Sequence, residues 1–462
     1  MDQELLDKVI KAYDIRGLVD EEISADFTFA LGIAFAKFIE REREPATIVV
    51  GEDMRPSSPD LATAFSDGIT SQGLDVIRIG LCSTDQLYFA SGALNMPGAM
   101  FTASHNPAQY NGIKLCRSGA KPIGQESGLA WIKSAIAQGF PIPNRPMGKE
   151  RSQDLLADYV KFLFSLFPEK SFAPDFQSRP LRIAIDAGNG MGGHTAPAVM
   201  REINAIVDGI YFELDGSFPN HEANPIEPKN LVDLQNLVRE KGSDIGLAFD
   251  GDADRCFLVD EKGNLVSPSA LTALIAKREL IKNPGASIIY NLICSKAVLE
   301  VITESGGRPL RSRVGHSYIK QMMADEGAVF GGEHSGHFYF KDFWSADSGM
   351  LAALHAIAAL LESQIPLSEL MQSFNRYSLS GEINTTVVDQ GKAIDKIKSH
   401  FKDYEPGLTF DELDGLTVKA KNWWFNLRSS NTEPLLRLNV EADTQEQMAS
   451  MRDLVLQLIR NG

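Results

Sequence analysis

Three aspartates alternate with other residues in DGDADR, residues 250–255, directly after the strand-like run DIGLAF. At this spacing in a tight turn, Asp250, Asp252 and Asp254 can converge on one cation, and a donor set made only of oxygen atoms selects Mg²⁺ or Ca²⁺ over zinc or copper. An EF-hand loop is excluded, because Arg255 stands where that loop needs glycine and strand-like runs flank the segment. A solvated acidic turn is the alternative, but three neighbouring acids repel one another without a cation. The segment therefore predicts a hard-cation site.

Ser104 lies in TASHNP, residues 102–107, after a second strand-like run, GAMF. Open α/β sheets bind their ligands at the carboxyl ends of strands, so this serine could act as a nucleophile or accept a phosphate. The segment lacks the G-x-S-x-G elbow of acyl hydrolases. Taken alone, it fits a helix cap about as well, with Pro107 in the first turn. The role of Ser104 therefore depends on what other segments bring to it.

Two further loops carry groups suited to a polyol and to a phosphate. GGEHSGH, residues 331–337, combines a carboxylate, a hydroxyl and two imidazoles, which can bind vicinal hydroxyls and move protons, although a plain hairpin turn is the competing interpretation. RSSNTEP, residues 428–434, offers a guanidinium with hydroxyl and amide groups, which suits a phosphate monoester; a helix N-cap is the alternative. Arg16 and Lys114 are cations that could offset phosphate charge, although either alone would pass as a surface residue.

A glycine-rich segment, GNGMGG at residues 188–193, follows the run LRIAIDA and matches the dinucleotide fingerprint G-x-G-x-x-G. Glu213 and Asp215 come later than the acid that the fingerprint requires about 20 residues further on. A structural turn that needs a close backbone approach is therefore favoured over a dinucleotide site. A Rossmann dehydrogenase is the weakest of the functional hypotheses.

The composition excludes several classes of protein. The chain has 462 residues, 44% hydrophobic and 23% charged, which is typical of a soluble globular protein. Its 45 Lys and Arg residues against 61 Asp and Glu residues give a net charge of −16, so nucleic acid is not an expected partner. The four cysteines lack C-x-x-C spacing and fit a reducing cytoplasm. We expect no export signal, and the longest apolar run, residues 350–361, is too short to cross a membrane.

Short apolar runs alternate with amphipathic helical patterns along most of the chain. This alternation predicts an α/β fold class, with parallel sheets covered by helices on both faces. In the helical pattern at residues 24–44, Ser24 can cap the first turn. After about residue 371 the pattern changes to short strands and two helices, which is typical of a small antiparallel α+β domain.

Together, these segments resemble the α-D-phosphohexomutase superfamily, most closely its bacterial phosphomannomutase/phosphoglucomutase branch. The resemblance runs from residue 12 to residue 434 through the ordered motifs AYDIRG, TASHNP, YNGIK, DGDADR, VGHS, GEHSGH and RSSNTEP. It implies three α/β domains and a C-terminal α+β domain around a central active-site cleft. The implied domains carry, in order, the phosphoserine, metal-binding, sugar-binding and phosphate-binding loops, and they occupy residues 1–148, 149–255, 256–370 and 371–462.

The resemblance implies an isomerase that interconverts hexose 1-phosphate and hexose 6-phosphate, with mannose and glucose as the expected sugars. A phosphoserine would donate its phosphate to one hydroxyl, and the resulting hexose 1,6-bisphosphate would turn around and return its other phosphate. The implied cofactor is Mg²⁺, and the bisphosphate is the implied activator. The implied catalytic residues are Ser104, Arg16, Lys114, His337 and Arg255. The implied metal ligands are Asp250, Asp252, Asp254 and an oxygen of phosphorylated Ser104.

The implied substrate contacts lie in four segments of the chain. They are Tyr13, His316, Glu333, His334, Ser335, Gly336, Arg428, Ser430, Asn431 and Thr432. A small phosphosugar is the expected partner, with neither nucleic acid nor a membrane, and the oligomeric state stays open between monomer and dimer. The main alternative is a Mg²⁺-dependent sugar phosphatase, which would share the carboxylate cluster. A noncatalytic sugar-phosphate sensor would keep the phosphate clamp without the nucleophile.

The sequence departs from the family pattern at two positions. Many relatives have a basic residue where this chain has Ile293, so one phosphate contact depends on whether Lys296 reaches the substrate. Close relatives often carry methionine where this chain has His334, a difference that could tune sugar preference. Glycine and serine gather near residues 376–382, which we expect to act as the hinge on which the C-terminal domain closes.

Overall fold

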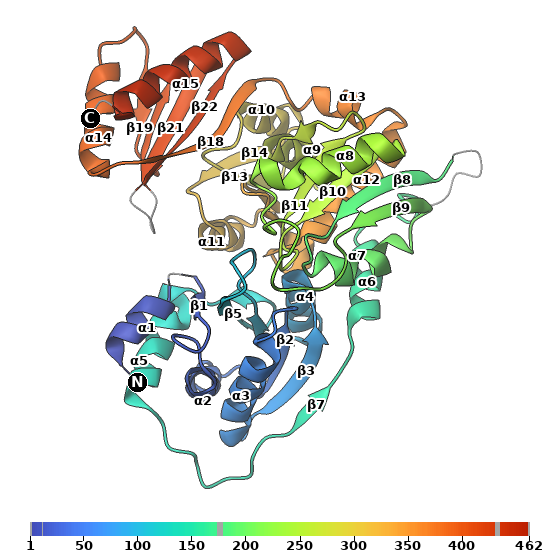
Figure 1. The fold of residues 1–462 in the computed structure, drawn as a ribbon, viewed down its shortest axis with the longest axis vertical. Helices are drawn as coiled ribbons and strands as arrows, with labels where there is room; N and C mark the ends of the chain where they lie inside the picture. The colour runs from blue at the N-terminus through green and yellow to red at the C-terminus, as the bar shows by residue number, and fades with distance from the viewer. Residues whose placement is uncertain (1, 12, 173–178, 430–434, 461–462) are drawn as a thin grey trace.

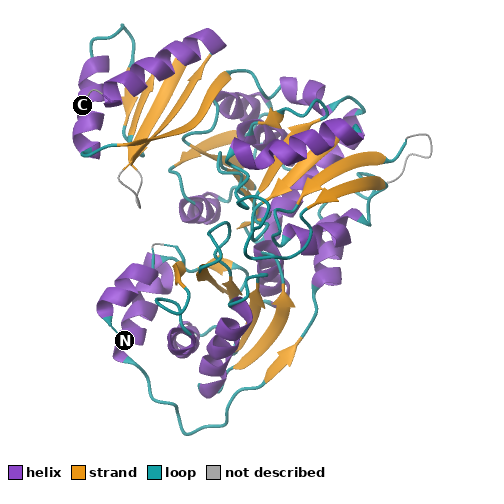
Figure 2. Ribbon diagram, viewed as in Figure 1, coloured by secondary structure: helices purple, strands orange, loops and turns teal. Residues whose placement is uncertain are grey.

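The computed structural model describes residues 2–11, 13–172, 179–429 and 435–460, which form four β-sheets that follow one another along the chain (Figure 1). The first and fourth sheets lie at opposite ends of the long axis, with the second and third between them, and helices cover the sheets (Figure 2). The predicted fold class of three α/β units and an α+β unit is confirmed. Its central cleft stays a prediction. No helix within the described ranges is both long and apolar enough to cross a membrane.

The first sheet has seven strands in the order β1-β5-β4-β2-β3-β7, with β6 beside β5. The strands are β1 (Ile15–Leu18), β2 (Thr47–Glu52), β3 (Asp75–Leu81), β4 (Gly98–Phe101), β5 (Tyr110–Arg117), β6 (Lys121–Pro122) and β7 (Glu150–Ser152). The helices are α1 (Gln3–Val9), α2 (Ala25–Glu42), α3 (Ser58–Ser71), α4 (Thr84–Leu94) and α5 (Ala130–Gln138), with a π-helical turn at Gln125–Leu129. Ser24 caps α2 as predicted, because its side chain accepts a hydrogen bond from the Phe27 N–H.

The second sheet has the order β12-β11-β10-β8-β9. Its strands are β8 (Leu181–Asp186), β9 (Ala205–Ile210), β10 (Ile245–Phe249), β11 (Cys256–Asp260) and β12 (Leu265–Val266). Its helices are α6 (Leu156–Ser165), α7 (Gly192–Met200) and α8 (Val232–Lys241), with a 3₁₀ turn at Pro228–Leu231. The sheet continues beyond the domain boundary predicted at residue 255, because β10 and β11 pair as one hairpin. The first sheet likewise gains β7, beyond the boundary predicted at residue 148.

The third sheet has the order β14-β13-β15-β16-β17. Its strands are β13 (Ser287–Asn291), β14 (Arg308–Ser312), β15 (Phe330–Gly332), β16 (Phe338–Phe340) and β17 (Ala346–Asp347). Its helices are α9 (Pro268–Lys282), α10 (Lys296–Glu304), α11 (His316–Glu326), α12 (Gly349–Ser363) and α13 (Leu367–Gln372), with a 3₁₀ turn at Lys341–Phe343.

The fourth sheet is antiparallel throughout, in the order β18-β22-β21-β20-β19. Its strands are β18 (Ser378–Thr386), β19 (Thr409–Asp411), β20 (Leu416–Lys419), β21 (Trp423–Ser429) and β22 (Leu435–Ala442). Two helices, α14 (Gln390–Phe401) and α15 (Gln445–Arg460), supply apolar side chains to its core. This unit is the small α+β domain that the sequence predicts after residue 371.

Each polar loop of the first three units connects a strand of the parallel part of a sheet to an antiparallel neighbour. Residues 102–109 join β4 to β5, residues 250–255 join β10 to β11, and residues 333–337 join β15 to β16. The prediction of parallel sheets is therefore wrong for part of each sheet, because the chain turns back directly beside the strand it has left. As a result, each loop sits at the carboxyl end of a parallel strand, where α/β sheets bind ligands.

One hydrophobic core joins the first three units through α4, α6 and α12. Buried Asp85, on α4, accepts hydrogen bonds from the Tyr159 hydroxyl of α6 at 2.7 Å and from the Ser348 hydroxyl at the start of α12 at 2.6 Å. Ser83 donates to the same carboxylate. The first three units are therefore joined by a polar hub as well as by apolar packing.

Polar contacts hold the fourth unit against the third. Arg311 of β14 forms an ion pair with Asp411 of β19. The Val314 N–H donates to Asp414 Oδ2 at 3.1 Å. Rotation of the fourth unit about residues 376–382 would have to break these contacts, and that rotation stays a prediction.

Replacing Asp85 with Asn should flatten the pH dependence of stability. Burial raises the pKa of Asp85 to about 6, even though three hydroxyl groups donate to it. An acid whose folded-state pKa exceeds its unfolded-state value stabilises the fold relative to higher pH, and this advantage is lost as the pH rises from about 4 to about 6. The loss amounts to about 3 kcal/mol for this shift.

Urea unfolding of wild type and Asp85→Asn at two pH values, about 4.5 and about 7, measures this difference. Asp158→Asn changes an exposed carboxylate on α6 and should keep the wild-type dependence. An Asp85→Asn protein with the wild-type pH dependence would contradict the burial of a perturbed carboxyl at the hub.

Candidate active site

The three aspartates of DGDADR lie together at the tip of the β10–β11 hairpin. One carboxylate oxygen from each of Asp250, Asp252 and Asp254 lies within 4.8 Å of the others, and each residue is at most 2% exposed. Ala253 adopts a left-handed backbone conformation, with φ of 60°, so the chain turns sharply between the last two aspartates. The convergence predicted from the alternating acids is therefore present.

Lys114 and Thr84 of the first unit contact two of these carboxylates. The Lys114 ammonium, on β5, lies 2.7 Å from Oδ2 of both Asp252 and Asp254. The Thr84 hydroxyl, at the start of α4, donates to Asp252 Oδ2 at 2.7 Å. Burial alone would raise the pKa of Asp252 and lower that of Lys114, but their ion pair holds the pKa of Asp252 well below and the pKa of Lys114 well above its ordinary value. The first unit thus supplies charge that the aspartate hairpin needs.

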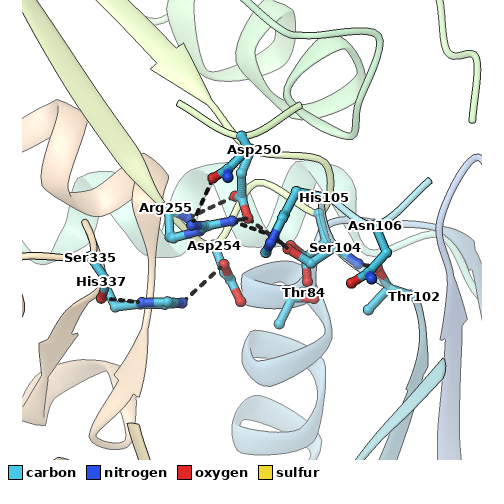
Figure 3. Close-up of polar contacts among 12 residues, drawn as sticks. Thr84, Thr102, Ser104, His105, Asn106, Asp250, Asp254, Arg255, Ser335 and His337 are labelled. Atoms are coloured by element: carbon cyan, nitrogen blue, oxygen red, sulfur yellow. Dashed lines mark hydrogen bonds and ion pairs between the residues drawn. The ribbon is translucent and has the colours of Figure 1, made fainter. Parts of the chain in front are cut away.

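Asp250 receives a different pair of donors, Arg255 and Ser104. Arg255 Nε and Ser104 Oγ each donate to Asp250 Oδ2 at 2.9 Å, as Figure 3 shows. Burial raises the pKa of Asp250; the Arg255 guanidinium opposes this shift, whereas Asp254 and Asp252 add to it. The serine chosen from the sequence therefore lies directly against the aspartate cluster.

The Ser104 loop and the aspartate hairpin approach each other backbone to backbone. Ser104 has a φ of 50°, a left-handed conformation that is uncommon outside glycine, and its N–H donates to Thr102 Oγ1 at 2.9 Å. A Cβ on Gly251 would lie 2.2 Å from the Ser104 carbonyl oxygen. Gly251 is therefore required by the close approach of the two loops rather than by its own dihedral angles.

His105, next to the serine, takes part in the same cluster. Its Nδ1 lies 2.7 Å from Arg255 Nη2 and 3.1 Å from Ser104 Oγ (Figure 3). Because a guanidinium can only donate, Nδ1 accepts and the ring proton lies on Nε2. Burial, Arg255 and Arg16 lower the pKa of His105 well below its ordinary value, so the imidazole is neutral. The sequence motifs predict no role for His105.

The third unit brings His337 to the aspartates. His337 Nε2 lies 3.6 Å from Asp254 Oδ1, and its Nδ1 lies 2.9 Å from Ser335 Oγ (Figure 3). The two hairpins are also joined by their backbones, because the Cys256 N–H donates to the Gly336 carbonyl at 3.3 Å. A Cβ on Gly336 would collide with the Phe257 ring at 2.4 Å. Gly336 therefore allows the second and third units to dock.

Glu333 lies at the start of the same loop and is 2% exposed. Its Oε2 accepts a hydrogen bond from the Tyr339 hydroxyl at 2.7 Å, and its Oε1 accepts from the Gly315 N–H at 3.1 Å. This carboxylate is therefore fixed in orientation by its own domain. Neighbouring His334 has a pKa lowered by burial.

The two N-terminal site residues lie at the edge of the cluster. Arg16 Nη1 donates to Asn106 Oδ1, in the Ser104 loop, at 2.6 Å, and its Nη2 donates to Asp14 at 2.6 Å. The ring of Tyr13 meets the ring of Tyr318, on α11, edge to face with centroids 6.3 Å apart. Arg16 therefore contacts the serine loop, whereas Tyr13 contacts the third unit.

The aspartate cluster fits a hard divalent cation. Oδ1 of Asp252 and Oδ1 of Asp254 are buried without a hydrogen-bond partner among the described residues, and buried carboxylate oxygens rarely stay unpaired. An all-oxygen donor set suits Mg²⁺. A second group, Asp254 with His337 and Asp347, includes a nitrogen donor, and its Asp347 is already paired with Lys320 at 2.6 Å. The hairpin cluster is therefore the better cation site.

Comparison with known proteins gives full-length matches. Models of the phosphoglucomutase/phosphomannomutase family match as α/β/α domain I at residues 7–140, domain II at 157–263, domain III at 267–377 and the C-terminal domain at 382–458. A phosphomannomutase of Escherichia coli is 39% identical over 443 residues, with 94% of each chain covered. The chain belongs to the phosphoglucomutase/phosphomannomutase family.

Further relatives agree with this membership in the α-D-phosphohexomutase superfamily. A phosphomannomutase of Methanocaldococcus jannaschii is 38% identical, covering 98% of this chain and 97% of that one. A crystal structure of a phosphoglucomutase/phosphomannomutase family protein from Burkholderia thailandensis matches with a TM-score of 0.86 at 29% identity, covering 100% and 99%. As a family member, the protein is a hexose phosphate mutase, an isomerase, and the sugar phosphatase alternative is not favoured. The family depends on Mg²⁺, which the aspartate cluster could hold.

The structure brings half of the site residues chosen from the sequence around one centre. The residues that meet at or beside the aspartates are Ser104, Arg16, Lys114, Arg255, Ser335, His337, Asp250, Asp252 and Asp254. Arg428 instead lies on β21 of the fourth unit, where its Nη2 donates to Glu382 at 2.7 Å. Ser430, Asn431 and Thr432 lie outside the described residues, and His316 is the first residue of α11.

Two further expectations from the sequence concern Lys296 and the glycine-rich turn at residues 188–193. Lys296, considered as a substitute for the basic residue missing at Ile293, lies with Nζ 4.6 Å from the Tyr377 ring centroid and 3.6 Å from Glu300.

The glycine-rich turn at residues 188–193 is structural, because a Cβ on Gly190 would meet the Gly251 carbonyl oxygen at 2.6 Å. That turn therefore packs directly against the backbone of the aspartate hairpin.

Replacing Gly251 with Ala should cut the mutase turnover number on the order of 100-fold, because the new methyl group would push the Ser104 carbonyl away by an ångström or more. Gly391→Ala is the matched control, since a Cβ there meets only Asp389 Oδ1, at 3.6 Å. Steady-state kinetics with thermal melting separates a misplaced serine from an unfolded protein. Equal activity of the two variants would mean that the close approach does not matter.

Replacing Asp252 with Asn should weaken Mg²⁺ binding by about tenfold or more, because the site loses one ligand charge. Calorimetric titration of the metal-free protein measures this affinity directly, and Asp154→Asn, on an exposed side chain, serves as the control. An unchanged Mg²⁺ affinity, or recovery of activity by zinc but not magnesium after chelation, would refute the oxygen-ligand site.

Proposed function

We propose that this protein interconverts the 1-phosphate and 6-phosphate of mannose and of glucose through phosphorylated Ser104 and a hexose 1,6-bisphosphate. The observation that carries this proposal is the 2.9 Å hydrogen bond from Ser104 Oγ to Asp250 within the aspartate cluster. A hydroxyl held beside a hard-cation site is where a phosphoryl group can be both carried and transferred. The family membership supports the reaction class.

The phosphoserine divides a difficult transfer into two in-line steps. In the first, a hydroxyl of the hexose monophosphate attacks the phosphorus, the bond from phosphorus to Ser104 Oγ breaks, and the bisphosphate forms. After the bisphosphate turns around, Ser104 Oγ attacks its other phosphate and the new monophosphate leaves. Mg²⁺ held by the three aspartates and a phosphoserine oxygen would supply charge stabilisation at this site. Arg255 and Arg16 add positive charge on the protein side.

Proton transfer at the sugar hydroxyl requires an acid and a base beside Ser104. Lys114 and His337 are our candidates, because both contact Asp254, from opposite domains. Each can exchange a proton with a hydroxyl placed at the cluster. The pair can serve both half-reactions, since the acid of one step is the base of its reverse.

The nonreacting phosphate and the sugar ring need their own contacts in both orientations. We assign the phosphate to Arg428, Ser430, Asn431 and Thr432, so that Arg428 would exchange its bond with Glu382 for one with the phosphate. The sugar hydroxyls are assigned to the loop of the third unit and its neighbours. The residues concerned are Tyr13, His316, Glu333, His334, Ser335 and Gly336.

The proposal extends to activator, domains and location. Hexose 1,6-bisphosphate would restore phosphate to a serine that has lost it, and would thus act as the activator. The phosphoserine domain would end near residue 152 and the metal-binding domain near residue 266, where their sheets end. All four cysteines are free and buried, which fits a reducing cytoplasm. A small phosphosugar is the partner that the reaction needs.

Replacing Ser104 with Ala should abolish interconversion, because it removes the hydroxyl that carries the phosphate in both half-reactions. Wild type incubated with mannose 1-phosphate or glucose 1-phosphate, Mg²⁺ and a trace of the bisphosphate should form the 6-phosphate without releasing inorganic phosphate. Intact-mass analysis should find a phosphorylated species in wild type and in Ser127→Ala, an exposed serine of the same domain, but not in Ser104→Ala. Full activity in Ser104→Ala would refute Ser104 as the phosphate carrier. Stoichiometric release of inorganic phosphate by wild type would instead indicate a phosphatase.

A further inference from the structure

Arg55 is the largest of the fully buried side chains among the described residues, and it is 1% exposed. It follows β2 in GEDMR, residues 51–55, a segment with no recognisable functional motif. A guanidinium keeps its charge in proteins, so burying one is costly unless nearby acceptors or opposite charges compensate it. The partners of Arg55 are therefore informative about what it does.

Four of those partners are backbone carbonyls of the serine loop. Arg55 Nη2 donates to the carbonyls of Ser104 at 2.8 Å and Asn106 at 2.6 Å. Its Nη1 donates to the carbonyls of Pro107 and Tyr110, both at 2.9 Å. One side chain thus gathers the carbonyl groups of the loop that carries Ser104, from the serine itself to the start of β5.

The Arg55 guanidinium is held by Asp53 of its own unit and by Phe218 of the second unit. Asp53 Oδ2 lies 3.2 Å from Arg55 Nε, and Asp53 Oδ1 accepts hydrogen bonds from the Arg55 N–H at 3.0 Å and the Ser58 hydroxyl at 2.7 Å. The ring of Phe218, in the second unit, covers the guanidinium with its centroid 5.4 Å from Cζ. Arg55 therefore has little freedom to leave the loop.

The serine loop has physical reasons to need such a partner. Ser104 has a φ of 50°, which is strained for a residue with a side chain. Converging carbonyl oxygens also repel one another unless a cation or a set of donors lies between them. The fork of Arg55 meets both needs, because two donors on one nitrogen fix two carbonyls at defined angles.

We infer that Arg55 is a positioning residue for phosphoryl transfer: it holds the backbone of the Ser104 loop so that Oγ faces Asp250 and Arg255. The inference rests on the proposed function but goes beyond it, because Arg55 is buried and its role is assigned through Ser104. A lysine at this position would keep the charge but lose the planar fork. The Ser104 hydroxyl should then no longer be held toward Asp250, even though the buried charge remains.

Arg55→Lys tests the inference, with Arg78→Lys as the matched control. Arg78 lies in the same sheet, its side chain is 13% exposed, and it pairs with Glu52, away from the serine loop. We expect the rate at which glucose 1,6-bisphosphate phosphorylates Ser104 to fall on the order of 100-fold in Arg55→Lys, with KM for hexose phosphate within about threefold of wild type. Arg78→Lys should keep the wild-type rate.

Chemical rescue separates positioning from a merely structural role. In Arg55→Ala, added guanidinium ion should restore part of the phosphorylation rate, whereas methylammonium ion should not. Should Arg55→Lys unfold at the assay temperature, Phe218→Leu carries the test, because it removes only the ring that covers the guanidinium. Slower phosphorylation of Ser104 at an unchanged melting temperature supports the inference in that variant, and an unchanged rate overturns it.

Wild-type phosphorylation of Ser104 in folded Arg55→Lys overturns the inference, and so does a loss that merely follows the folded fraction of the protein. These outcomes leave the proposed function intact, provided that wild type isomerises its substrate and Ser104→Ala does not. If wild type itself takes up no phosphate from the bisphosphate, the proposed function fails, and the inference fails with it.

Discussion

Three buried carboxylates within 4.8 Å of one another are the constraint on which the active site depends. Like charges at this distance in a poorly solvated site cannot all remain ionised without compensation. The compensation comes from both sides of a domain boundary: Lys114 belongs to the first unit and Arg255 to the hairpin itself. The aspartate hairpin is therefore complete only when the first and second units are docked. A divalent cation would add to this compensation at Oδ1 of Asp252 and Oδ1 of Asp254, which have no hydrogen-bond partner among the described residues.

Each of the first three units places its polar loop with the same strand arrangement. A parallel strand ends in a polar loop, and the chain returns antiparallel, so the loop is held at both ends by a sheet. Glycines then let the loops touch: Gly251 faces the Ser104 carbonyl, and Gly336 faces Phe257. The hub at Asp85 and the shared apolar core keep the units in that arrangement. The position of the Ser104 hydroxyl therefore depends on how the first three units dock against one another.

Local spacing predicted much of this site, and long-range contacts explain what it left out. The alternation in DGDADR and the position of Ser104 after a strand are local signals, and the residues that they point to lie together in the structure. Arg55, Asp85 and Thr84 gave no such signal, because their partners lie 49, 263 and 168 residues away in the sequence. The sequence shows only that Arg55 follows the strand-like run ATIVVG within a few residues. The boundary predicted at residue 255 divided a hairpin, because the motif was taken as the end of a unit rather than as its turn.

The central claim is that Ser104 carries the phosphate that reaches the sugar. The most direct measurement is a single turnover of enzyme labelled with radioactive phosphate on Ser104, mixed with unlabelled glucose 1-phosphate and Mg²⁺ and stopped by rapid quench. The account predicts that the label leaves the protein at least as fast as the steady-state turnover and appears first in the 1,6-bisphosphate. Label that stays on the protein during turnover, or that appears as inorganic phosphate, would contradict it.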